Sequence, residues 1–153
     1  MPVPKSVVKI NKNGVEYVSS VDKANYYIFE LTRAALRDVG KLCCRRFRDS
    51  YYQHFKRRTR KAGKSLSYNV WSNKRTLYPR VQIGIKQGVK GFYSLFQEFG
   101  SSKTQKLGLL RKAVEGNIAE IIRIESQYLS AIEQEERARQ LINEAEISGD
   151  VDD

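Results

Sequence analysis

The most constraining feature of this sequence is a helical period of apolar residues from about Asp22 to about Arg58. With successive residues placed 100° apart, one side of the predicted helix collects Ile28, Leu31, Ala35, Val39, Leu42 and Cys43. The opposite side collects basic residues together with Tyr52. The period therefore predicts one long amphipathic helix. Gly40 costs about 1 kcal/mol relative to alanine within it and is a candidate bend.

A β-hairpin is predicted before this helix. Residues 7–10 and 15–18 are rich in β-branched residues and flank Asn13-Gly14. Asparagine and glycine both accept positive φ, which the two-residue turn of a hairpin requires. With a two-residue loop, Ile10 lies opposite Tyr17.

Two more strands are predicted after the helix, beyond a basic loop at residues 59–64. Residues 66–71 alternate between apolar and polar types over most of their length. Residues 81–85 alternate more clearly and are bounded by Pro79 and Gly88, which are typical of strand ends.

Two helices are predicted in the remaining sequence. The first is short and ends at Gly100, and its apolar residues follow helical spacing: Phe92, Leu95, Phe96 and Phe99. Residues 102–105 then resemble a capping box for a second, long helix. One broad apolar face of that helix carries Leu110, Val114, Ile118, Ile121, Ile122, Tyr128, Leu129 and Ile132.

The order of these elements predicts an α+β fold, in which long N-terminal and C-terminal helices pack on a small antiparallel β-sheet. A short helix precedes the last long helix. Residues 1–147 are expected to form a single domain that includes the hairpin at 7–18. Residues 148–153 are expected to form a disordered acidic tail.

The charge of the chain is large and unevenly distributed. There are 28 Lys and Arg residues against 17 Asp and Glu, a formal net charge of +11. Residues 126–153 hold 8 acids and 2 bases, so residues 1–125 hold 26 bases and 9 acids. A body with a net charge of +17 is expected to meet a polyanion or acidic protein surfaces, unless the charge serves solubility alone.

Several classes of protein are disfavoured by the sequence. No apolar stretch is long enough for a membrane span, and no secretory signal is recognisable at the N-terminus, so we expect a soluble protein of the compartment where it is made. Cys43 and Cys44 are adjacent and cannot easily bridge each other, and with His54 they make no zinc set. The single histidine and the scarcity of acids between Tyr51 and Lys112 argue against an enzyme. We expect no metal and no cofactor.

Nucleic-acid binding is an alternative function, because residues 41–64 hold ten bases and one acid with aromatic residues interleaved. Bases can neutralise phosphates, and exposed aromatic rings can stack on nucleobases. No recognised DNA-reading module frames the segment, so the contact would be non-specific. This basic surface, facing a partner or DNA, would consist of Arg37, Lys41, Arg45, Arg48, Lys56, Arg57, Arg58, Arg60, Lys61 and Lys64.

Two segments together resemble a family of phage proteins. Residues 91–103 (GFYSLFQEFGSSK), followed by residues 109–113 (LLRKA), resemble the "hydrophobic-x-E-F-G-T-S" box and the downstream "F-L-R-x-A" of neck or tail-completion proteins of long-tailed bacteriophages, often described as minor tail components. Residues 63–67 (GKSLS) lie where that family shows "T-G-x-L-x-x-S". Ser101 replaces the usual threonine, prolines common after the box are missing, and Thr59 is not adjacent to Gly63.

The resemblance implies a structural virion protein that helps to join the tail to the DNA-filled head by protein–protein contacts in a ring. Its partners would be other tail or connector proteins and further copies of itself, with possible non-specific contact to DNA and no membrane. It would be located in the neck or tail of the virion, and in the host cytoplasm during assembly. The family-like residues are Glu98, Phe99, Gly100, Ser101, Ser102, Gly63 and Leu66. Candidate anchors for protein contacts are Phe92, Phe96, Trp71 and Tyr93. For the two phenylalanines, the helical spacing favours packing in the core instead.

The acidic C-terminal segment is a second candidate assembly surface. We expect its glutamates to contact the basic stripe between Arg37 and Lys56, within the subunit or preferably on a neighbour in a ring. The alternative is a solvated segment that only aids solubility. The acidic residues in question are Glu133, Glu135, Glu136 and Glu144.

Overall fold

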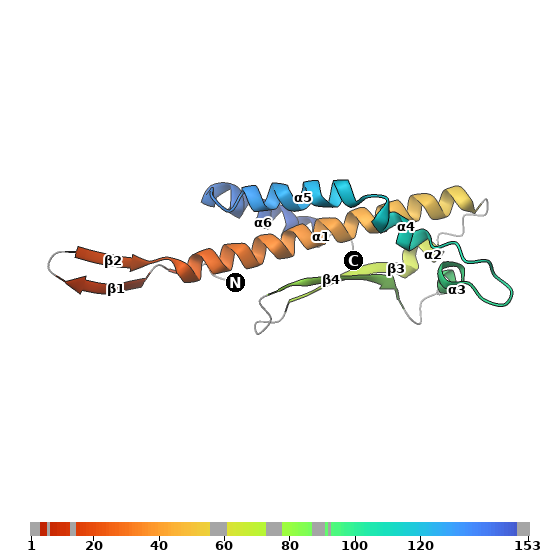
Figure 1. Cartoon of the computed structure of the whole chain (residues 1–153), viewed down its shortest axis with the longest axis horizontal. Helices are drawn as coiled ribbons and strands as arrows, with labels where there is room; N and C mark the ends of the chain where they lie inside the picture. The colour runs from red at the N-terminus through yellow and green to blue at the C-terminus, as the bar shows by residue number, and fades with distance from the viewer. Residues whose placement is uncertain are drawn as a thin grey trace.

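The computed structural model describes residues 4–5, 7–12, 15–55, 61–72, 78–86, 91 and 93–149. Figure 1 shows an elongated α+β molecule built along one long helix, α1 (Val21–His54). The hairpin β1 (Val7–Lys12) and β2 (Val15–Ser19) precedes α1. After α1 come the short helix α2 (Lys61–Ser65), the strands β3 (Leu66–Trp71) and β4 (Arg80–Ile85), and the helices α3 (Ser94–Phe99), α4 (Leu109–Glu115), α5 (Ile118–Ser130) and α6 (Glu135–Gly149).

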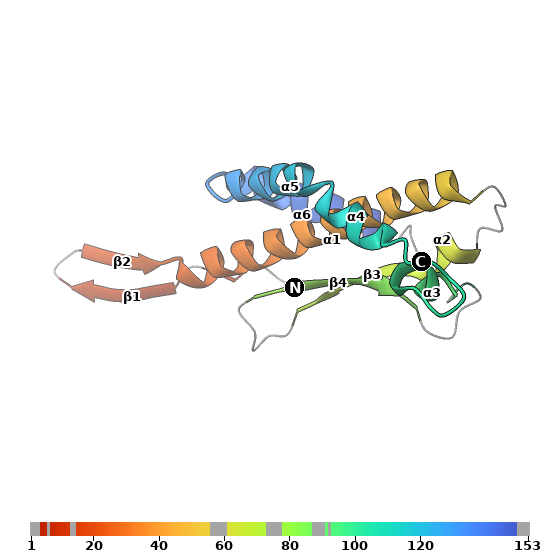
Figure 2. The same ribbon diagram turned by 45° about the vertical axis from the view of Figure 1, so that its right-hand side comes forward.

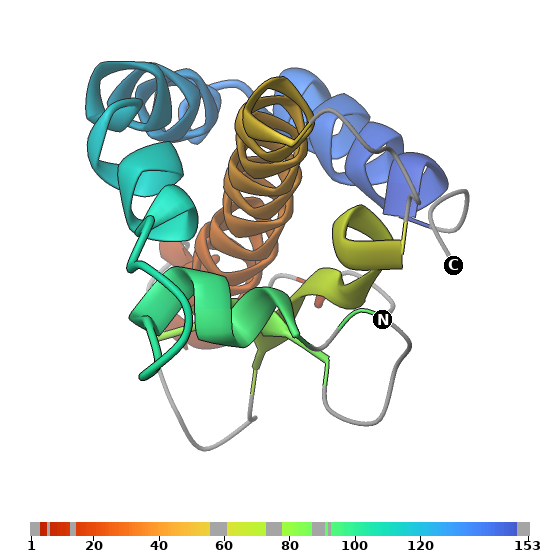
Figure 3. The same cartoon turned by 90° about the vertical axis from the view of Figure 1, so that its right-hand side faces the viewer.

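The α1 helix lies at the centre of the body. Seen along its axis in Figure 3, α1 lies between α5 on one side and α6 on the other, and the β3–β4 sheet lies below it. The predicted apolar residues Leu31 and Val39 are buried, but Ile28 remains 44% exposed. Ala34 and Phe47 are also buried although they lie outside the predicted stripe, because α1 is covered on several sides.

The core forms two clusters along α1. Near the N-terminal half, small residues let α1, α5 and α6 pack closely, and the buried set is Tyr27, Leu31, Ala34, Ala35, Tyr128, Ala138, Ile142 and Ala145. Near the C-terminal half, the buried set is Cys44, Phe47, Tyr51, Leu66 and Ala113. Tyr128 also donates a hydrogen bond to Asp38, and burial raises the pKa of this tyrosine. Cys43 and Cys44 are both buried free thiols.

The four predicted strands are present. β1 pairs antiparallel with β2, and Ile10 lies opposite Tyr17 as predicted, although the register shifts by one residue between Val8 and Ile10. Asn13 and Gly14 themselves lie outside the described residues. β3 pairs antiparallel with β4 through Leu66–Ile85, Tyr68–Ile83 and Val70–Val81 pairs, and these alternate positions are less exposed than Asn69, Trp71, Arg80 and Gln82.

Gly40 is an uninterrupted part of α1 and serves as a packing site rather than a helix end. A Cβ atom at this position would lie 2.6 Å from Cγ of Tyr68, so glycine lets β3 approach the helix closely. α1 ends at His54, because Phe55 adopts extended backbone angles. The helix therefore stops before the predicted end near Arg58, and residues 56–60 lie outside the described residues. The predicted basic loop is in part the short helix α2.

The prediction of one long final helix is wrong. The chain turns at Gly116-Asn117 and again at residues 131–134, which divides the segment into α4, α5 and α6. The side chain of Asn117 donates to the carbonyl of Ala113 at 2.8 Å, which ends α4 with a polar contact. The predicted capping box is also wrong, because residues 101–104 form a turn and α4 begins only after Gly108.

The C-terminal boundary also differs from the prediction. α6 continues through Gly149, so residues 148–149 are helical, and the rest of the expected acidic tail lies outside the described residues. No helix within the described ranges is long and apolar enough to span a membrane.

Candidate assembly surface

The family-like segments lie next to each other at the end of the molecule where α1 ends. Figure 2 shows α2, α3 and α4 gathered at this end. The hydroxyl groups of Ser65 and Ser94 both donate to the carbonyl of Gly91, at 3.3 and 3.0 Å, and their oxygens are 3.3 Å apart. Both serines are buried. These bonds join the segment that contains Gly63 and Leu66 to the start of α3.

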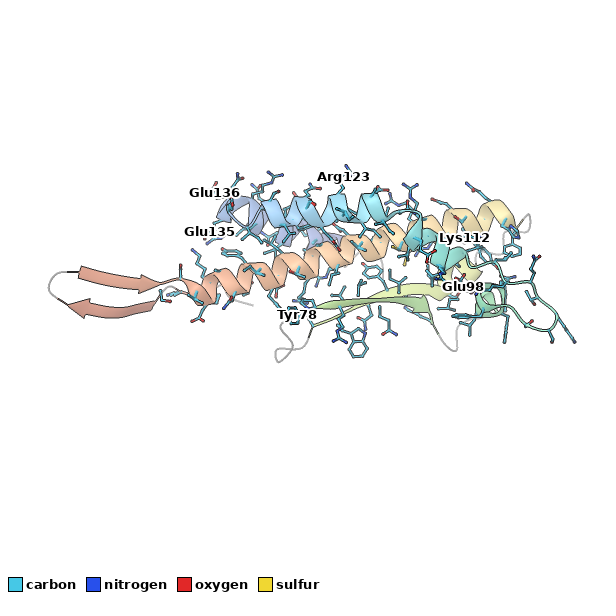
Figure 4. All side chains as sticks on the ribbon, in the orientation of Figure 1. Tyr78, Glu98, Lys112, Arg123, Glu135 and Glu136 are labelled. Atoms are coloured by element: carbon cyan, nitrogen blue, oxygen red, sulfur yellow. The ribbon has the colours of Figure 1, made fainter. Side chains whose placement is uncertain are left out.

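Glu98 connects α3 to the helix that follows it. Its side chain is only 7% exposed, and its carboxylate accepts hydrogen bonds from the backbone N–H groups of Leu110 at 2.9 Å and Arg111 at 3.1 Å. These are the second and third residues of α4, whose N-cap, Gly108, has no side chain to cap the helix. Glu98 therefore caps α4 although it belongs to a different helix (Figure 4). Its negative charge also interacts favourably with the dipole at the N-terminus of α4.

Gly100 begins the loop that makes this contact possible. Its φ of +84° and ψ of 161° are accessible almost only to glycine, and its N–H donates to the carbonyl of Phe96 at 2.8 Å. Gly100 ends α3 as predicted, and its conformation is closer to the mirror image of extended backbone than to the left-handed helix. Ser101 then pairs with Thr104, and the N–H of Leu107 donates to the carbonyl of Gln97 at 2.8 Å, so the loop folds back on α3.

The orientation of α3 leaves its apolar side chains at the surface. The expectation from sequence was an apolar face turned inward, but Ser94 and Glu98 are the buried residues of this helix. We define the α3 surface as Tyr93, Leu95, Phe96 and Phe99, which are 39%, 41%, 47% and 69% exposed. Adjacent apolar side chains that remain exposed are typical of protein interaction sites.

The four candidate anchors lie at different places in the structure. Phe96 and Tyr93 belong to the α3 surface, and Trp71 is 61% exposed on the outer side of the β3–β4 sheet, where its indole N–H donates to Gln82 at 3.0 Å. Tyr78, 76% exposed, precedes β4 near the same sheet (Figure 4). Phe92 lies outside the described residues.

The aromatic residues within the basic segment mostly form core. Phe47 and Tyr51 are buried, and Phe55 packs against the same cluster, so these rings are not open stacking platforms. Tyr51 donates to Oε1 of Gln97 at 2.7 Å, which fixes α3 against α1. Burial, with a smaller contribution from Tyr93, raises the pKa of Tyr51 to about 12.

The basic surface is only partly described. Arg45, Arg48 and Lys64 are exposed, whereas Arg37 and Lys41 are half-buried. Arg48 donates to the carbonyl of Gly63 at 3.2 Å, and Lys61 begins α2. Arg46, which the sequence analysis did not single out for the surface, pairs with Glu120 of α5 at 2.9 Å. Lys56, Arg57, Arg58 and Arg60 lie outside the described residues.

The start of α6, with Glu135 and Glu136, lies at the other end of the body. Figure 4 shows Glu135 and Glu136 far from Glu98. Glu135 pairs with Lys23 at 2.6 Å and Arg139 at 2.5 Å, and it accepts a hydrogen bond from Tyr27. The hydrogen bond from Lys23 is the main cause of its lowered pKa.

Within the subunit, Glu135 therefore contacts the first turn of α1 rather than the expected stripe between Arg37 and Lys56. The turn before α6 places Glu135 beside Lys23, so the intrasubunit form of the predicted contact is not formed by this residue. The contact with a neighbouring subunit stays a prediction. Glu133, Glu136 and Glu144 are exposed.

Among the described residues, no group of three or more His, Cys, Asp or Glu side chains could hold a metal ion. The buried Glu98 is engaged by two backbone donors. The chain matches no protein-family model, no curated protein and no solved structure.

Proposed function

We propose that this chain is a structural protein of the neck or tail-completion region of a long-tailed bacteriophage, and that it helps to join the tail to the DNA-filled head. The observation that carries the proposal is the position of the family-like residues. Glu98, Gly100 and the segment around Ser65 lie at one end of the molecule and together hold the α3 surface outward. A role of this kind depends on contacts between proteins and requires no catalytic turnover.

The α3 surface is the proposed contact site for a neighbouring tail or connector protein. Aromatic and large apolar side chains with neighbours that exclude water carry most of the energy of protein interfaces. Phe99 is the most exposed of them, and its backbone is fixed between Glu98 and Gly100. A surface held rigid before binding loses less entropy on association than a flexible one.

The proposal is tested with the tail-tube and connector proteins encoded beside this chain. We expect the purified chain to bind at least one of them, and Phe99→Ser to weaken that binding by about tenfold or more, because a large buried apolar side chain contributes about 1.5–3 kcal/mol. Ile147→Ser is the matched control, since Ile147 is 70% exposed on α6 at a distance from α3. Absence of binding to every neighbour, together with normal joining of heads and tails after deletion of the gene, would refute the role.

Non-specific nucleic-acid binding by residues 41–64 is a second candidate, supported by the exposed guanidinium groups of Arg45 and Arg48. With Phe47 and Tyr51 buried, this binding would rest on phosphate contacts alone. For duplex DNA, log affinity is expected to fall with log salt with a slope of about −0.9 per phosphate neutralised. The double variant Arg45→Gln, Arg48→Gln should reduce that slope, and a chain that binds no DNA at low salt excludes the function.

A further inference from the structure

The hairpin β1–β2 extends away from the rest of the molecule. Figures 1 and 2 both show it beyond the ends of the helices and of the β3–β4 sheet. Its strands pair with each other and with neither strand of the other sheet. Residues 7–19 nevertheless contain six large apolar residues. An isolated two-stranded hairpin is marginally stable in water, so a hairpin of this composition is expected to pack on a surface.

A suitable surface lies between the N-terminal half of α1 and α5. An apolar groove of about 150 Å³ is lined chiefly by Ile28, Leu31, Leu36, Tyr128 and Leu129. Ile28 is 44% exposed and Leu129 is 61% exposed at this groove. The exposed apolar stripe continues along α5 through Ile122 and Ile118, which are 55% and 53% exposed.

The charges of the two surfaces are complementary. Residues 5–19 carry three lysines and one glutamate, a net charge of +2. Residues 118–130, which form α5 beside the groove, carry two glutamates and one arginine, a net charge of −1. Glu125 lies in the groove lining itself. Opposite net charges favour encounter and orient the two surfaces.

The lengths of the two surfaces also agree, and the direction of the hairpin excludes contact with the groove of its own chain. A strand of six residues is about 20 Å long, and the part of α1 from Val21 to Leu36 is about 22 Å long. The hairpin of the same chain leaves the start of α1 in the direction away from this groove, as Figures 1 and 2 show. A hairpin from another molecule has no such restriction.

We propose that the β1–β2 hairpin of one copy docks on the α1–α5 groove of a second copy. The contact joins two different surfaces, so it closes either by reciprocal exchange between two copies or by rotation into a ring. It uses residues at the opposite end from the α3 surface. The proposed phage role and this self-association can therefore fail independently.

The test is sedimentation of the full chain over a range of concentrations. We expect concentration-dependent self-association that weakens at high salt, and Leu129→Asp should weaken it by about tenfold or more. Ile147→Asp is the matched control, because it adds the same charge at an exposed isoleucine outside the groove. A wild-type chain that remains monomeric, or a Leu129→Asp variant that associates like the wild type, overturns the proposal.

A second measurement identifies the surfaces. Lys12→Cys in one sample and Glu125→Cys in another should form a mixed disulfide under oxidising conditions, whereas Lys12→Cys with Gln82→Cys should not. Gln82 is exposed on the β3–β4 sheet, and the native thiols Cys43 and Cys44 are buried. Equal cross-linking of both pairs would mean that the hairpin does not select the groove, and the proposal would be wrong.

Discussion

Replacement of Glu98 by alanine is the most informative perturbation of this fold. The carboxylate belongs to α3, but the two N–H groups that it accepts belong to α4. The substitution therefore removes a contact between elements and leaves the sequence of α4 unchanged. Glu98→Gln is a milder version that keeps one acceptor oxygen and removes the charge.

The magnitude follows from the groups involved. Loss of a helix N-cap costs about 0.5–2 kcal/mol, and loss of a negative charge near a helix N-terminus costs about 0.3–1 kcal/mol more. The side chain is nearly buried, so truncation also leaves space that water or neighbours must fill. We expect Glu98→Ala to lower the free energy of unfolding by about 2–3 kcal/mol. Glu98→Gln should lower it by about 1–2 kcal/mol, because its amide group presents a donor to one of the N–H groups.

The assay is urea unfolding followed by far-ultraviolet circular dichroism, with the same m-value required of each variant. Glu115→Ala is the control on α4 itself. Glu115 forms an exposed pair with Arg111 at 2.7 Å, and such pairs contribute less than about 1 kcal/mol. If Glu98→Ala and Glu115→Ala have the same urea midpoint, Glu98 does not hold α4 in place and this explanation of the family-like glutamate fails.

Three further substitutions and one control test the fold. Gly40→Ala should destabilise the fold by about 1–3 kcal/mol, because the new methyl group would clash with Cβ and Cγ of Tyr68; this outweighs the better helix propensity of alanine. Gly84→Ala is the control: the added methyl group has open space there, and the melting temperature should be nearly unchanged. Gly100→Val should lower the free energy of unfolding by about 1–3 kcal/mol, and an unchanged melting temperature would contradict the strained backbone angles. Glu135→Gln should lower the free energy of unfolding at pH 7. Because the pKa of Glu135 is lowered in the folded state, the difference in unfolding free energy between this variant and the wild type should shrink as pH falls below the ordinary value of 4.5. Equal differences at pH 7 and pH 3 would refute the ion pair.

The sequence was sufficient for elements whose pattern is local. The register of β1 and β2 next to the turn follows from the turn length, whereas the shift between Val8 and Ile10 does not. The alternation in β3 and β4 follows from one face packing on α1. The α1 helix was predicted nearly to its ends for the same reason. The full set of buried residues in α1 was not predicted, because an apolar pattern on one side of the helix could not indicate that helices and a sheet cover α1 on several sides.

The sequence was insufficient where contacts between distant residues decide the structure. Apolar spacing through Gly116 suggested an unbroken helix, but the chain instead turns there and folds α5 along α1. The orientation of α3 was missed for a similar reason. Its apolar spacing favoured burial of the phenylalanines, whereas the hydrogen-bond partners of Ser94 and Glu98 come from other segments and are not visible in a local pattern.

The three consecutive residues Glu98, Phe99 and Gly100 have distinct physical roles that depend on one another. Glu98 must point inward to reach the N–H groups of α4, and Gly100 must adopt a positive φ to return the chain to that helix. Phe99 lies between them and is 69% exposed. The same geometry that stabilises the fold therefore exposes the aromatic ring of Phe99 to solvent. If this ring is a contact for another protein, the order glutamate, aromatic residue, glycine is explained.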